Sequence, residues 1–317
     1  MSDHINQQGW IIGAGHIAQE YAKILTNLGV KFITIGRSED GVHSFKQATG
    51  LHAEHGGLKK FLATKPATPD FAIVAVSVDQ LSATALDLMD FGVDKILLEK
   101  PGFLNPDEMP EILKKARGRD VRIAYNRRFL SSVITAQKIV KEDGGITSFR
   151  FDFTEWPSRI LSFTQPEGVL ENWFFLNSTH VVDMAFYLGG WPKELSCFCE
   201  GELPWHKPAI FSGAGRTEKN IPFSYIANWT SAGRWYVEIS TSKRKLIFCP
   251  LEELKQQPLN DVNIYDVEID NSHDKAYKPG FYAQTIDFLN ERPSLPRLEE
   301  QAAHLEVFKK MAGRATK

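Results

Sequence analysis

The sequence predicts an α/β protein whose N-terminal part is a doubly wound parallel sheet, and two observations support this fold. Short, nearly continuous apolar runs alternate with helical patterns, as in a parallel sheet covered by helices on both faces. Each run also stops at a glycine or a polar break, and ligands of such sheets bind at these carboxyl ends. The expected strands are residues 8–12, 30–35, 71–76 and 95–98, with a helix at 81–89.

The first break is a glycine turn, GAGHIA at residues 13–18, followed by a helical pattern that reaches Ile24. In a dinucleotide-binding turn the first glycine permits the bend, and the second lets the backbone approach a pyrophosphate. The third position needs only a small residue, so Ala18 fits. A structural glycine turn is the alternative. Helix N–H groups would face the phosphates, so we assign Gly13, Gly15, His16 and Ile17 to a cofactor site.

The second break indicates which dinucleotide is bound. Sites for NAD usually place an acidic residue after the second strand, whereas an arginine there accommodates the 2′-phosphate of NADP. This strand ends in Arg37 and Ser38, which offer a guanidinium and a hydroxyl donor. We therefore expect NADP in preference to NAD. The alternative is that Arg37 is a solvated loop cation and that Glu39 or Asp40 binds the ribose.

Two further breaks add polar groups at the same edge of the sheet. Ser77 follows the third expected strand, and Glu99, Lys100 and Pro101 follow the fourth. We assign Ser77, Glu99 and Lys100 to the cofactor site because of this position. A lysine held by the following proline can also place its ammonium over a nicotinamide and hydrogen-bond a substrate hydroxyl. On position alone, Lys100 is as well explained as a surface residue.

Composition excludes two classes of partner. The 317 residues are 43% hydrophobic and 24% charged, which is typical of a soluble globular protein with room for two domains. A formal net charge of −2 offers no basic field to nucleic acid or an anionic membrane, so a small metabolite is the expected partner. No signal-peptide pattern or long apolar run occurs, and three cysteines cannot all pair. We expect a cytoplasmic protein with reduced thiols.

Five segments carry a resemblance to a known family. Besides the glycine turn, they are LLEKPGF at 97–103, AYNRRF at 124–129, STHVVDMAFYLGG at 178–190 and KPGFYAQTIDFL at 278–289. Together they resemble the glucose-fructose oxidoreductase, inositol dehydrogenase and rhizopine catabolism family (Gfo/Idh/MocA) over essentially the whole chain. The resemblance implies a Rossmann domain at 1–124 and an α/β domain at 125–317. In this family the second domain has a large open, mainly antiparallel sheet that backs the substrate and often mediates oligomerisation, which implies a homodimer or homotetramer.

The patterns of the second half are compatible with such a domain. Alternating residues and helical spacing predict a β-rich meander between helices. The expected strands are 147–156, 194–201, 222–230, 233–241 and 243–249, and the expected helices are 131–141, 173–188, 280–291 and 297–312.

The resemblance identifies Lys100 as the lysine of the EKP motif and His180 as the catalytic histidine. From the residues alone, His180 is a satisfied core residue, a metal ligand with Asp183, or a catalytic base. A metal needs more ligands than this pair, so no metal site is predicted. A base needs reach to a hydroxyl proton and a cofactor that receives the hydride, and the glycine turn supplies the cofactor.

One position departs from the family pattern. Many members carry an aspartate four residues before the histidine, where this chain has Leu176. A leucine cannot accept a proton or orient a lysine. Either Asn177 and Ser178 hold the substrate hydroxyls instead, or the activity differs from inositol oxidation. The polar run 177–179 suits hydroxyl-rich substrates or amide substituents such as acetamido groups.

The predicted function is hydride transfer between a nicotinamide and a carbinol or ketone carbon of a sugar or sugar derivative, including amino and nucleotide sugars. His180 takes the carbinol proton, and Lys100 steadies the oxygen as charge develops. The residues assigned to the substrate are Lys100, Asn126, Arg159, Trp173, Asn177 and His180. Because some family members have lost catalysis and sense the cofactor, a regulatory protein is the alternative.

Overall fold

The computed structural model describes residues 7–314, which divide into two compact units. The first unit contains the described chain up to Tyr125 together with Phe281–Ala302. The second contains Asn126–Gly280 together with the chain from Ala303 onward. The sequence predicts one division, after residue 124, with a contiguous second domain. In the structure, residues 281–302 belong to the first unit instead.

Aromatic packing explains why residues 281–302 belong to the first unit. Helix α10 (Phe281–Leu289) turns its aromatic residues toward the first unit. The Phe281 ring centroid lies 5.0 Å from that of Tyr21, and the Phe288 ring centroid lies 5.9 Å from that of Phe71. All four rings are buried, so α10 completes the core of the first unit although it lies far along the chain.

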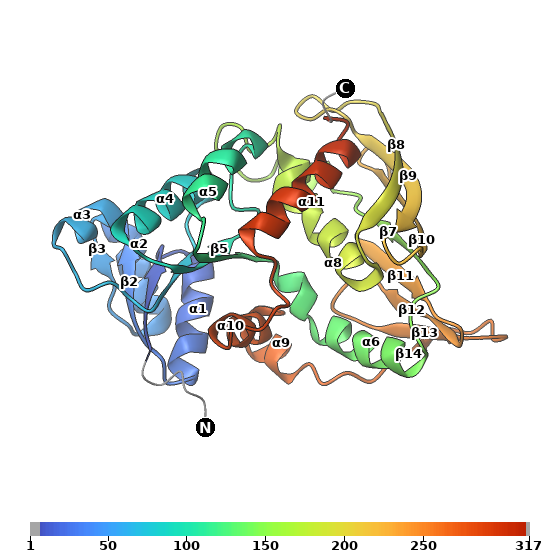
Figure 1. The fold of residues 1–317 in the computed structure, drawn as a ribbon, viewed down its shortest axis with the longest axis horizontal. Coiled ribbons are helices and arrows are strands. Elements are labelled where there is room, and N and C mark those ends of the chain that lie inside the picture. Colours follow the sequence, from blue (N-terminus) through green and yellow to red (C-terminus); the bar gives the residue numbers. More distant parts are fainter. Residues whose placement is uncertain (1–6, 315–317) are drawn as a thin grey trace. The chain divides into compact units, whose positions relative to one another are not determined.

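The first unit is built on a six-stranded parallel sheet in the order β3-β2-β1-β4-β5-β6 (Figure 1). Its strands are β1 (Gln8–Ile12), β2 (Lys31–Gly36), β3 (Glu54–His55), β4 (Phe71–Val74), β5 (Lys95–Glu99) and β6 (Asp120–Ala124). Its helices, besides α10, are α1 (His16–Asn27), α2 (Glu39–Thr49), α3 (Gly57–Ala63), α4 (Leu81–Phe91) and α5 (Met109–Lys115), with 3₁₀ turns at Val78–Gln80 and Pro106–Glu108. This strand order confirms the predicted doubly wound fold.

Burial on both faces explains why the apolar runs became central strands. Trp10 of β1 is 1% exposed, and its ring centroid lies 5.1 Å from that of Phe61 in α3 and 5.8 Å from that of Phe91 in α4. The edge strand β3 was not predicted. Both of its residues are exposed, so no apolar pattern marks it, and it pairs with β2 at the edge of the sheet.

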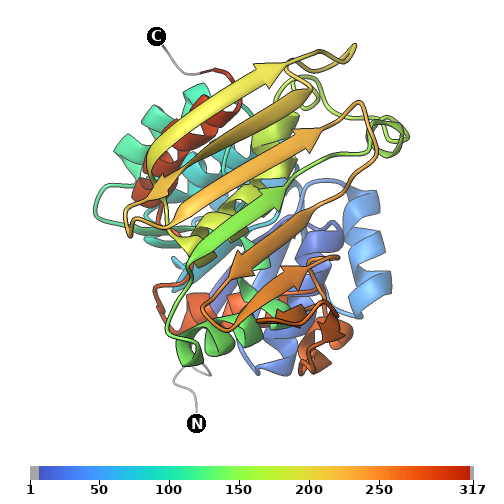
Figure 2. The same ribbon diagram turned by 90° about the vertical axis from the view of Figure 1, so that its right-hand side faces the viewer.

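The second unit is built on an eight-stranded sheet in the order β14-β13-β12-β11-β7-β10-β9-β8 (Figure 2). Its strands are β7 (Ser148–Asp152), β8 (Pro192–Glu200), β9 (Ile210–Thr217), β10 (Pro222–Asn228), β11 (Tyr236–Ser240), β12 (Arg244–Phe248), β13 (Lys255–Pro258) and β14 (Tyr265–Asp266). Strands β7 and β10 pair in parallel, and the other neighbours are antiparallel. The mainly antiparallel second sheet implied by the resemblance is thus confirmed.

This sheet differs from the sequence prediction in several details, and three of its strands, β9, β13 and β14, were not predicted. Strand β9 was not predicted because Gly213 and Gly215 interrupt its apolar alternation. A Cβ at Gly215 would lie 1.9 Å from the Glu194 carbonyl oxygen, so the neighbouring strand requires glycine there. The strand predicted at 147–156 ends at Asp152, whose Oδ1 accepts a hydrogen bond from the Thr154 N–H at 2.7 Å and turns the chain.

Helices cover one face of this sheet and leave the other open. The helices of this unit are α6 (Ser131–Glu142), α7 (Pro157–Ile160), α8 (Thr179–Gly189), α9 (Ser272–Ala276) and the end of α11 (Leu298–Met311), with a 3₁₀ turn at Asn126–Phe129 and a π-helical turn at Phe174–Ser178. Phe186 of α8 packs against Phe149, Phe151 and Phe223 of the sheet. The face seen in Figure 2 carries no helix of the described chain. No helix among residues 7–314 is long and apolar enough to cross a membrane.

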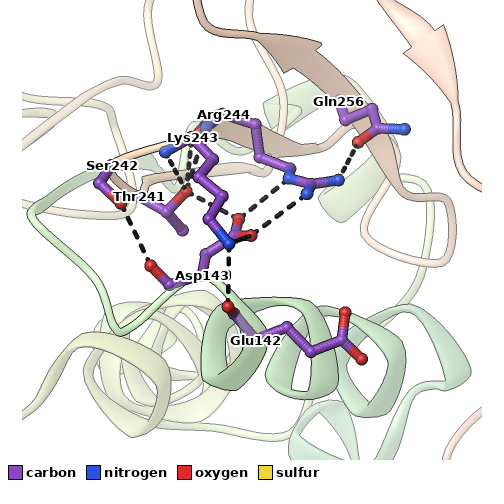
Figure 3. Close-up of polar contacts among 7 residues, drawn as sticks. All are labelled: Glu142, Asp143, Thr241, Ser242, Lys243, Arg244 and Gln256. Carbon is purple, nitrogen blue, oxygen red and sulfur yellow. Dashed lines mark hydrogen bonds and ion pairs between the residues drawn. The ribbon is translucent and has the colours of Figure 1, made fainter.

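A buried carboxylate joins the end of α6 to the turn between β11 and β12 (Figure 3). Asp143 is 5% exposed, and its two oxygens accept hydrogen bonds from Arg244 Nε at 2.9 Å and Nη2 at 3.2 Å. The hydroxyl of Thr241 donates to Asp143 Oδ2 at 2.9 Å, and Lys243 Nζ lies 3.7 Å from Oδ1. The carboxylate is therefore well compensated, and it fixes this hairpin against the helical layer.

Candidate functional site

The glycine turn has the geometry that a dinucleotide site requires. Gly13 has φ +119°, and a Cβ there would lie 2.2 Å from the Ala75 carbonyl oxygen, so glycine is needed for the chain to bend beside β4. A Cβ at Gly15 would meet nothing within 4 Å. Its missing side chain keeps the space before α1 open rather than relieving a clash. Ala18 is fully buried, as the third position of the motif demands.

A cavity of about 550 Å³ lies beside this turn, within the first unit. Five predicted cofactor residues line it: Gly13, Gly15, Arg37, Ser38 and Ser77. Its volume is in the range of small-molecule sites, and exposed backbone at the start of α1 can reach a phosphate group there. The residues present therefore fit a nicotinamide dinucleotide.

Arg37 and Ser38 stand at the end of β2 on the wall of this cavity. Ser38 Oγ accepts a hydrogen bond from the Gly41 N–H at 3.2 Å and so caps α2, while its own proton stays available to an acceptor. Glu39 and Asp40, the alternative partners of the ribose, are exposed in the first turn of α2 and do not line the cavity.

Sequence reasoning missed part of this wall. The start of α3, Gly56–Lys59, and Gln80 also line the cavity. A Cβ at Gly57 would lie 3.7 Å from Arg37 Cγ, so the start of α3 packs beside the arginine, and Lys59 adds a second cation. The available signal was the glycine pair, whose φ angles of +109° and +80° mark a turn that other residues rarely adopt.

A carboxylate lies near Arg37. Partial burial acts to raise the pKa of Asp79, but hydrogen bonds from Ser77 and Gln80 and the charge of Arg37 together lower it. Asp79 is therefore ionised at neutral pH and attracts the Arg37 guanidinium. Ser77, a predicted cofactor residue, therefore also hydrogen-bonds the Asp79 carboxylate.

Four other predicted residues lie outside the wall of this cavity. His16 and Ile17 form the first turn of α1, where His16 is exposed and Ile17 is half-buried. Glu99 and Lys100 follow at the end of β5, and both are half-buried. Glu99 Oε1 accepts a hydrogen bond from the Tyr21 hydroxyl at 2.8 Å, so this carboxylate is held by the protein.

In the second unit, His180 lies in the first turn of α8, directly after the π-helical turn. The sequence predicts one continuous helix at 173–188, but Phe174–Ser178 has the wider π geometry. Such turns are frequent at functional sites. His180 is half-buried, and its ring centroid lies 5.9 Å from that of Trp235. Leu176 is 6% exposed.

A carboxylate does stand near this histidine, although position 176 lacks one. Glu155 is 2% exposed, and its Oε1 accepts hydrogen bonds from Asn177 Nδ2 at 2.9 Å and from Ser178 Oγ at 2.8 Å. Burial raises the pKa of Glu155, against the opposing effect of these hydrogen bonds. Sequence reasoning missed Glu155 because only the fold brings the segment after β7 to the π-helical turn.

The polar run 177–179 faces the protein more than was expected. Ser178 and Thr179 are fully buried, and the Thr179 hydroxyl donates to the Phe175 carbonyl at 2.7 Å. Ser178 donates to Glu155, so its hydroxyl proton cannot serve a substrate. Of the three side chains, only Asn177 is partly exposed.

Asp183, the partner of His180 in the metal interpretation, is engaged elsewhere. It is fully buried, and its two oxygens accept hydrogen bonds from Arg128 Nε at 2.8 Å and Nη2 at 2.6 Å. Burial raises the pKa of Asp183, and the charge and hydrogen bonds of Arg128 oppose that rise. Within residues 7–314, no group of three or more His, Cys, Asp or Glu side chains is placed to hold a metal ion.

The other predicted substrate residues are in different settings. Arg159 is exposed in α7, and Trp173 is half-buried with its ring centroid 6.4 Å from that of Trp205. Asn126 is the one predicted substrate residue that is buried. It is 4% exposed, and its Nδ2 donates to the Pro279 carbonyl at 2.9 Å, which ties the Gly280 turn to the rest of the second unit.

Comparisons with known proteins establish the fold. No family model matches the chain, and no curated protein matches its sequence. An oxidoreductase from Agrobacterium radiobacter, in complex with NAD⁺, L-tartaric acid and magnesium, superposes with a TM-score of 0.75 at 14% identity, covering 98% of this chain and 96% of that chain. Levoglucosan dehydrogenase in complex with NADH gives the same TM-score, identity and coverage. For UDP-N-acetylglucosamine 3-dehydrogenase from Acidithiobacillus ferrooxidans, the TM-score is 0.72 at 14% identity, with 98% and 97% covered.

Proposed function

We propose that this protein is an oxidoreductase of the Gfo/Idh/MocA type that transfers a hydride between a nicotinamide dinucleotide and a carbinol or ketone carbon of a sugar-like substrate. The observation that carries the proposal is the cavity beside the glycine turn, where Gly13 is required by the backbone and Gly15 leaves room for a phosphate. The likeness in fold to oxidoreductases solved with NAD⁺ or NADH supports it.

The proposed chemistry uses two side chains. When bound, the nicotinamide accepts or donates the hydride at the substrate carbon. His180 takes the proton of the carbinol hydroxyl as the C–H bond breaks, and it returns the proton when a ketone is reduced. The Lys100 ammonium hydrogen-bonds the same oxygen and stabilises the negative charge that develops on it. Asn177, which Glu155 holds at 2.9 Å, is the amide available to a neighbouring hydroxyl.

Turnover with a panel of substrates tests this function. Purified protein is incubated with NADP⁺ or NAD⁺ and with sugars, inositols and nucleotide sugars, while absorbance of the reduced nicotinamide is followed. Lys100→Ala and His180→Ala should each lower kcat by about a hundredfold or more. The exposed residues Lys114 and His43 provide matched controls, Lys114→Ala and His43→Ala, that should leave it unchanged. Turnover that survives loss of Lys100 and His180 contradicts the mechanism, and cofactor binding without any turnover favours a regulatory protein.

We propose NADP as the preferred cofactor. Arg37, Ser38 and Lys59 line one wall of the cavity and together offer two cations and a hydroxyl to a 2′-phosphate. Arg37→Ala should weaken binding of NADP⁺ by about tenfold or more and hardly change binding of NAD⁺. Titrations of both cofactors, read by fluorescence, measure this difference. Equal losses of affinity for the two cofactors would contradict the assignment of Arg37 to the 2′-phosphate.

We also propose that the open face of the second sheet joins copies of this chain into a dimer or tetramer. Phe198 and Ile226, on strands β8 and β10, are 65% and 57% exposed there. Large apolar side chains on one sheet face are typical of an interface. Light scattering should show an oligomer for the natural chain and a smaller species for Phe198→Glu combined with Ile226→Glu. Val262→Glu, at an 88% exposed apolar residue outside the strands, is the control.

We also propose that the protein is cytoplasmic. Cys197, Cys199 and Cys249 are all free thiols. Burial raises the pKa of Cys199 to about 11, so this thiol is unreactive at neutral pH. Thiols kept in this form suit a reducing compartment.

A further inference from the structure

Two arginines of the second unit, Arg127 and Arg159, lie close enough to a third, Arg234, to repel its guanidinium. Arg127 is in the 3₁₀ turn Asn126–Phe129, Arg159 is in α7, and Arg234 precedes β11. Burial lowers the pKa of Arg234, and the charges of Arg159 and Arg127 lower it further, against the attraction of nearby carboxylates. We call these three residues the arginine cluster.

Tryptophan rings hold Arg127 and Arg234, two members of the arginine cluster, next to His180. The Arg234 guanidinium carbon lies 4.7 Å from the ring centroid of Trp156 and 4.5 Å from that of Trp235. The Arg127 guanidinium lies 5.7 Å from the Trp235 ring, which itself lies 5.9 Å from the His180 ring. A guanidinium stacked on aromatic rings keeps its N–H groups at its edge, where they can meet a ligand.

Carboxylates only partly balance this charge. Glu155 and Glu252 are the two that act on Arg234. Three guanidiniums against two carboxylates leave an excess of one positive charge when both carboxyls are ionised. Glu155 already accepts two hydrogen bonds, and its nearest oxygen to Arg234 is 3.7 Å away, beyond hydrogen-bond distance. Glu252 accepts from Arg127 Nη1 at 2.7 Å.

Arg128 shows what a structural arginine looks like in the same unit. Its side chain is 6% exposed and donates two short hydrogen bonds to Asp183. The Arg234 side chain is 40% exposed. The buried Arg127 Nε and Trp235 Nε1 have no hydrogen-bond acceptor among residues 7–314. Buried donors without acceptors are costly, and ligand oxygens are the groups that would satisfy them.

We infer that the arginine cluster binds an anionic group, a carboxylate or a phosphate, of a ligand whose ring stacks on Trp156. The Trp156 side chain is suited to this because it is 42% exposed while its Nε1 is anchored to the Gly233 carbonyl at 2.6 Å. Guanidiniums match the oxygen pairs of both anions. The inference rests on the proposed function, since it makes the sugar-like substrate an acidic one: a uronate, a sugar phosphate or a nucleotide sugar.

Direct binding tests the inference without turnover. The natural protein is titrated with glucuronate, glucose 6-phosphate, UDP and uncharged glucose, and binding is read by calorimetry and by quenching of tryptophan fluorescence. At least one anion should bind more tightly than glucose, and more weakly as salt is added. Preference for glucuronate identifies a carboxylate site, and preference for the other two identifies a phosphate site. Equal binding of glucose and all three anions overturns the inference.

Matched variants locate the site. Arg234→Gln and Arg127→Gln should weaken the preferred anion by about tenfold or more and leave NADP⁺ binding at its natural value. Arg216→Gln, which removes an exposed arginine of β9, is the control for the same loss of charge. Arg234→Lys keeps the charge without the planar fork and should give an intermediate loss. Thermal unfolding of each variant checks its fold.

The two proposals fail in different ways. If the anion binds as expected but no substrate in the panel reduces NADP⁺, the arginine cluster stands and hydride transfer fails. If turnover occurs with neutral sugars alone, and Arg234→Gln matches Arg216→Gln in binding, the arginine cluster is refuted and hydride transfer stands.

Discussion

The glycine turn of the first unit and the surroundings of His180 in the second are built in opposite ways. The turn depends on the backbone of six consecutive residues, and its one close approach is between Gly13 and the Ala75 carbonyl. Around His180, side chains come together from the segment after β7, the π-helical turn, and the residues before β11. A site made of backbone can be recognised in a short stretch of sequence, whereas one made of side chains depends on the whole fold.

Substitution of the two glycines should have the largest effects. Gly13→Ala places a Cβ against the Ala75 carbonyl at positive φ, so we expect a loss of about 2–4 kcal/mol in the free energy of unfolding. Gly15→Ala meets no atom within 4 Å, so stability should be unchanged. It should nevertheless weaken the cofactor by about tenfold or more, since its Cβ enters the space for the pyrophosphate.

Urea unfolding and cofactor titration of both variants separate these effects. Equal destabilisation by Gly13→Ala and Gly15→Ala would show that the turn is only structural. Unchanged cofactor binding in Gly15→Ala would show that the pyrophosphate does not bind at the turn.

Removal of the buried carboxylate near His180 should have the next largest effect. Glu155→Leu leaves Ser178 and Asn177 without their acceptor, which should cost about 2–4 kcal/mol of unfolding free energy. Glu155→Gln keeps an acceptor oxygen and should cost about 1 kcal/mol. Denaturant curves measure both. The control is Glu252→Leu at a 40% exposed ion pair, where we expect less than about 1 kcal/mol. If Glu155→Leu is as stable as the natural chain, Glu155 does not stabilise the π-helical turn.

A smaller effect should appear as a pH dependence that belongs to the second unit. The His304 ring is stacked on Trp191 with centroids 3.3 Å apart, and burial, followed by the charge of Arg128, lowers the pKa of His304 to about 3. The unfolded chain binds a proton near pH 6.5, but the folded chain does not. Stability is therefore present above that pH and falls as the pH drops toward 3, by at most about 1.4 kcal/mol per pH unit.

The variant His304→Phe should reduce this slope without abolishing it. Burial lowers the pKa of His206 to about 4, so a second histidine contributes in the same direction. Unfolding curves between pH 4 and 8 provide the measurement, and His43→Phe, at an exposed position, is the control. If the slope of His304→Phe equals that of the natural chain, the folded state tolerates the charged ring.

Local patterns explain how much of the molecule could be predicted. The apolar runs of β1, β4 and β5 are buried on both faces, so their sequence shows what they are. The glycine turn could also be predicted, because its whole motif lies within six consecutive residues. Strand β9 and the edge strand β3 were not, because glycines demanded by a neighbouring strand, or full exposure, erase the pattern.

Long-range contacts explain what could not be predicted. Glu155 meets Asn177 across 22 residues, and no property of either one in isolation indicates the other. Asn126 and Ser178 have the residue types of a binding site, but the fold turns both inward. The arginine cluster likewise draws on three elements that only tertiary packing brings together.

The return of α10 to the first unit has a consequence for how this protein is made and can be altered. Phe281 and Phe288 reach the Tyr21 and Phe71 rings only after the ribosome has added residues 126–280 of the second unit. The first unit therefore cannot complete its core during translation until residues 281–302 have been added. A single cut after residue 125 would leave these apolar rings exposed. Genetic exchange of this unit requires two separate segments of the gene, because residues 126–280 lie between them.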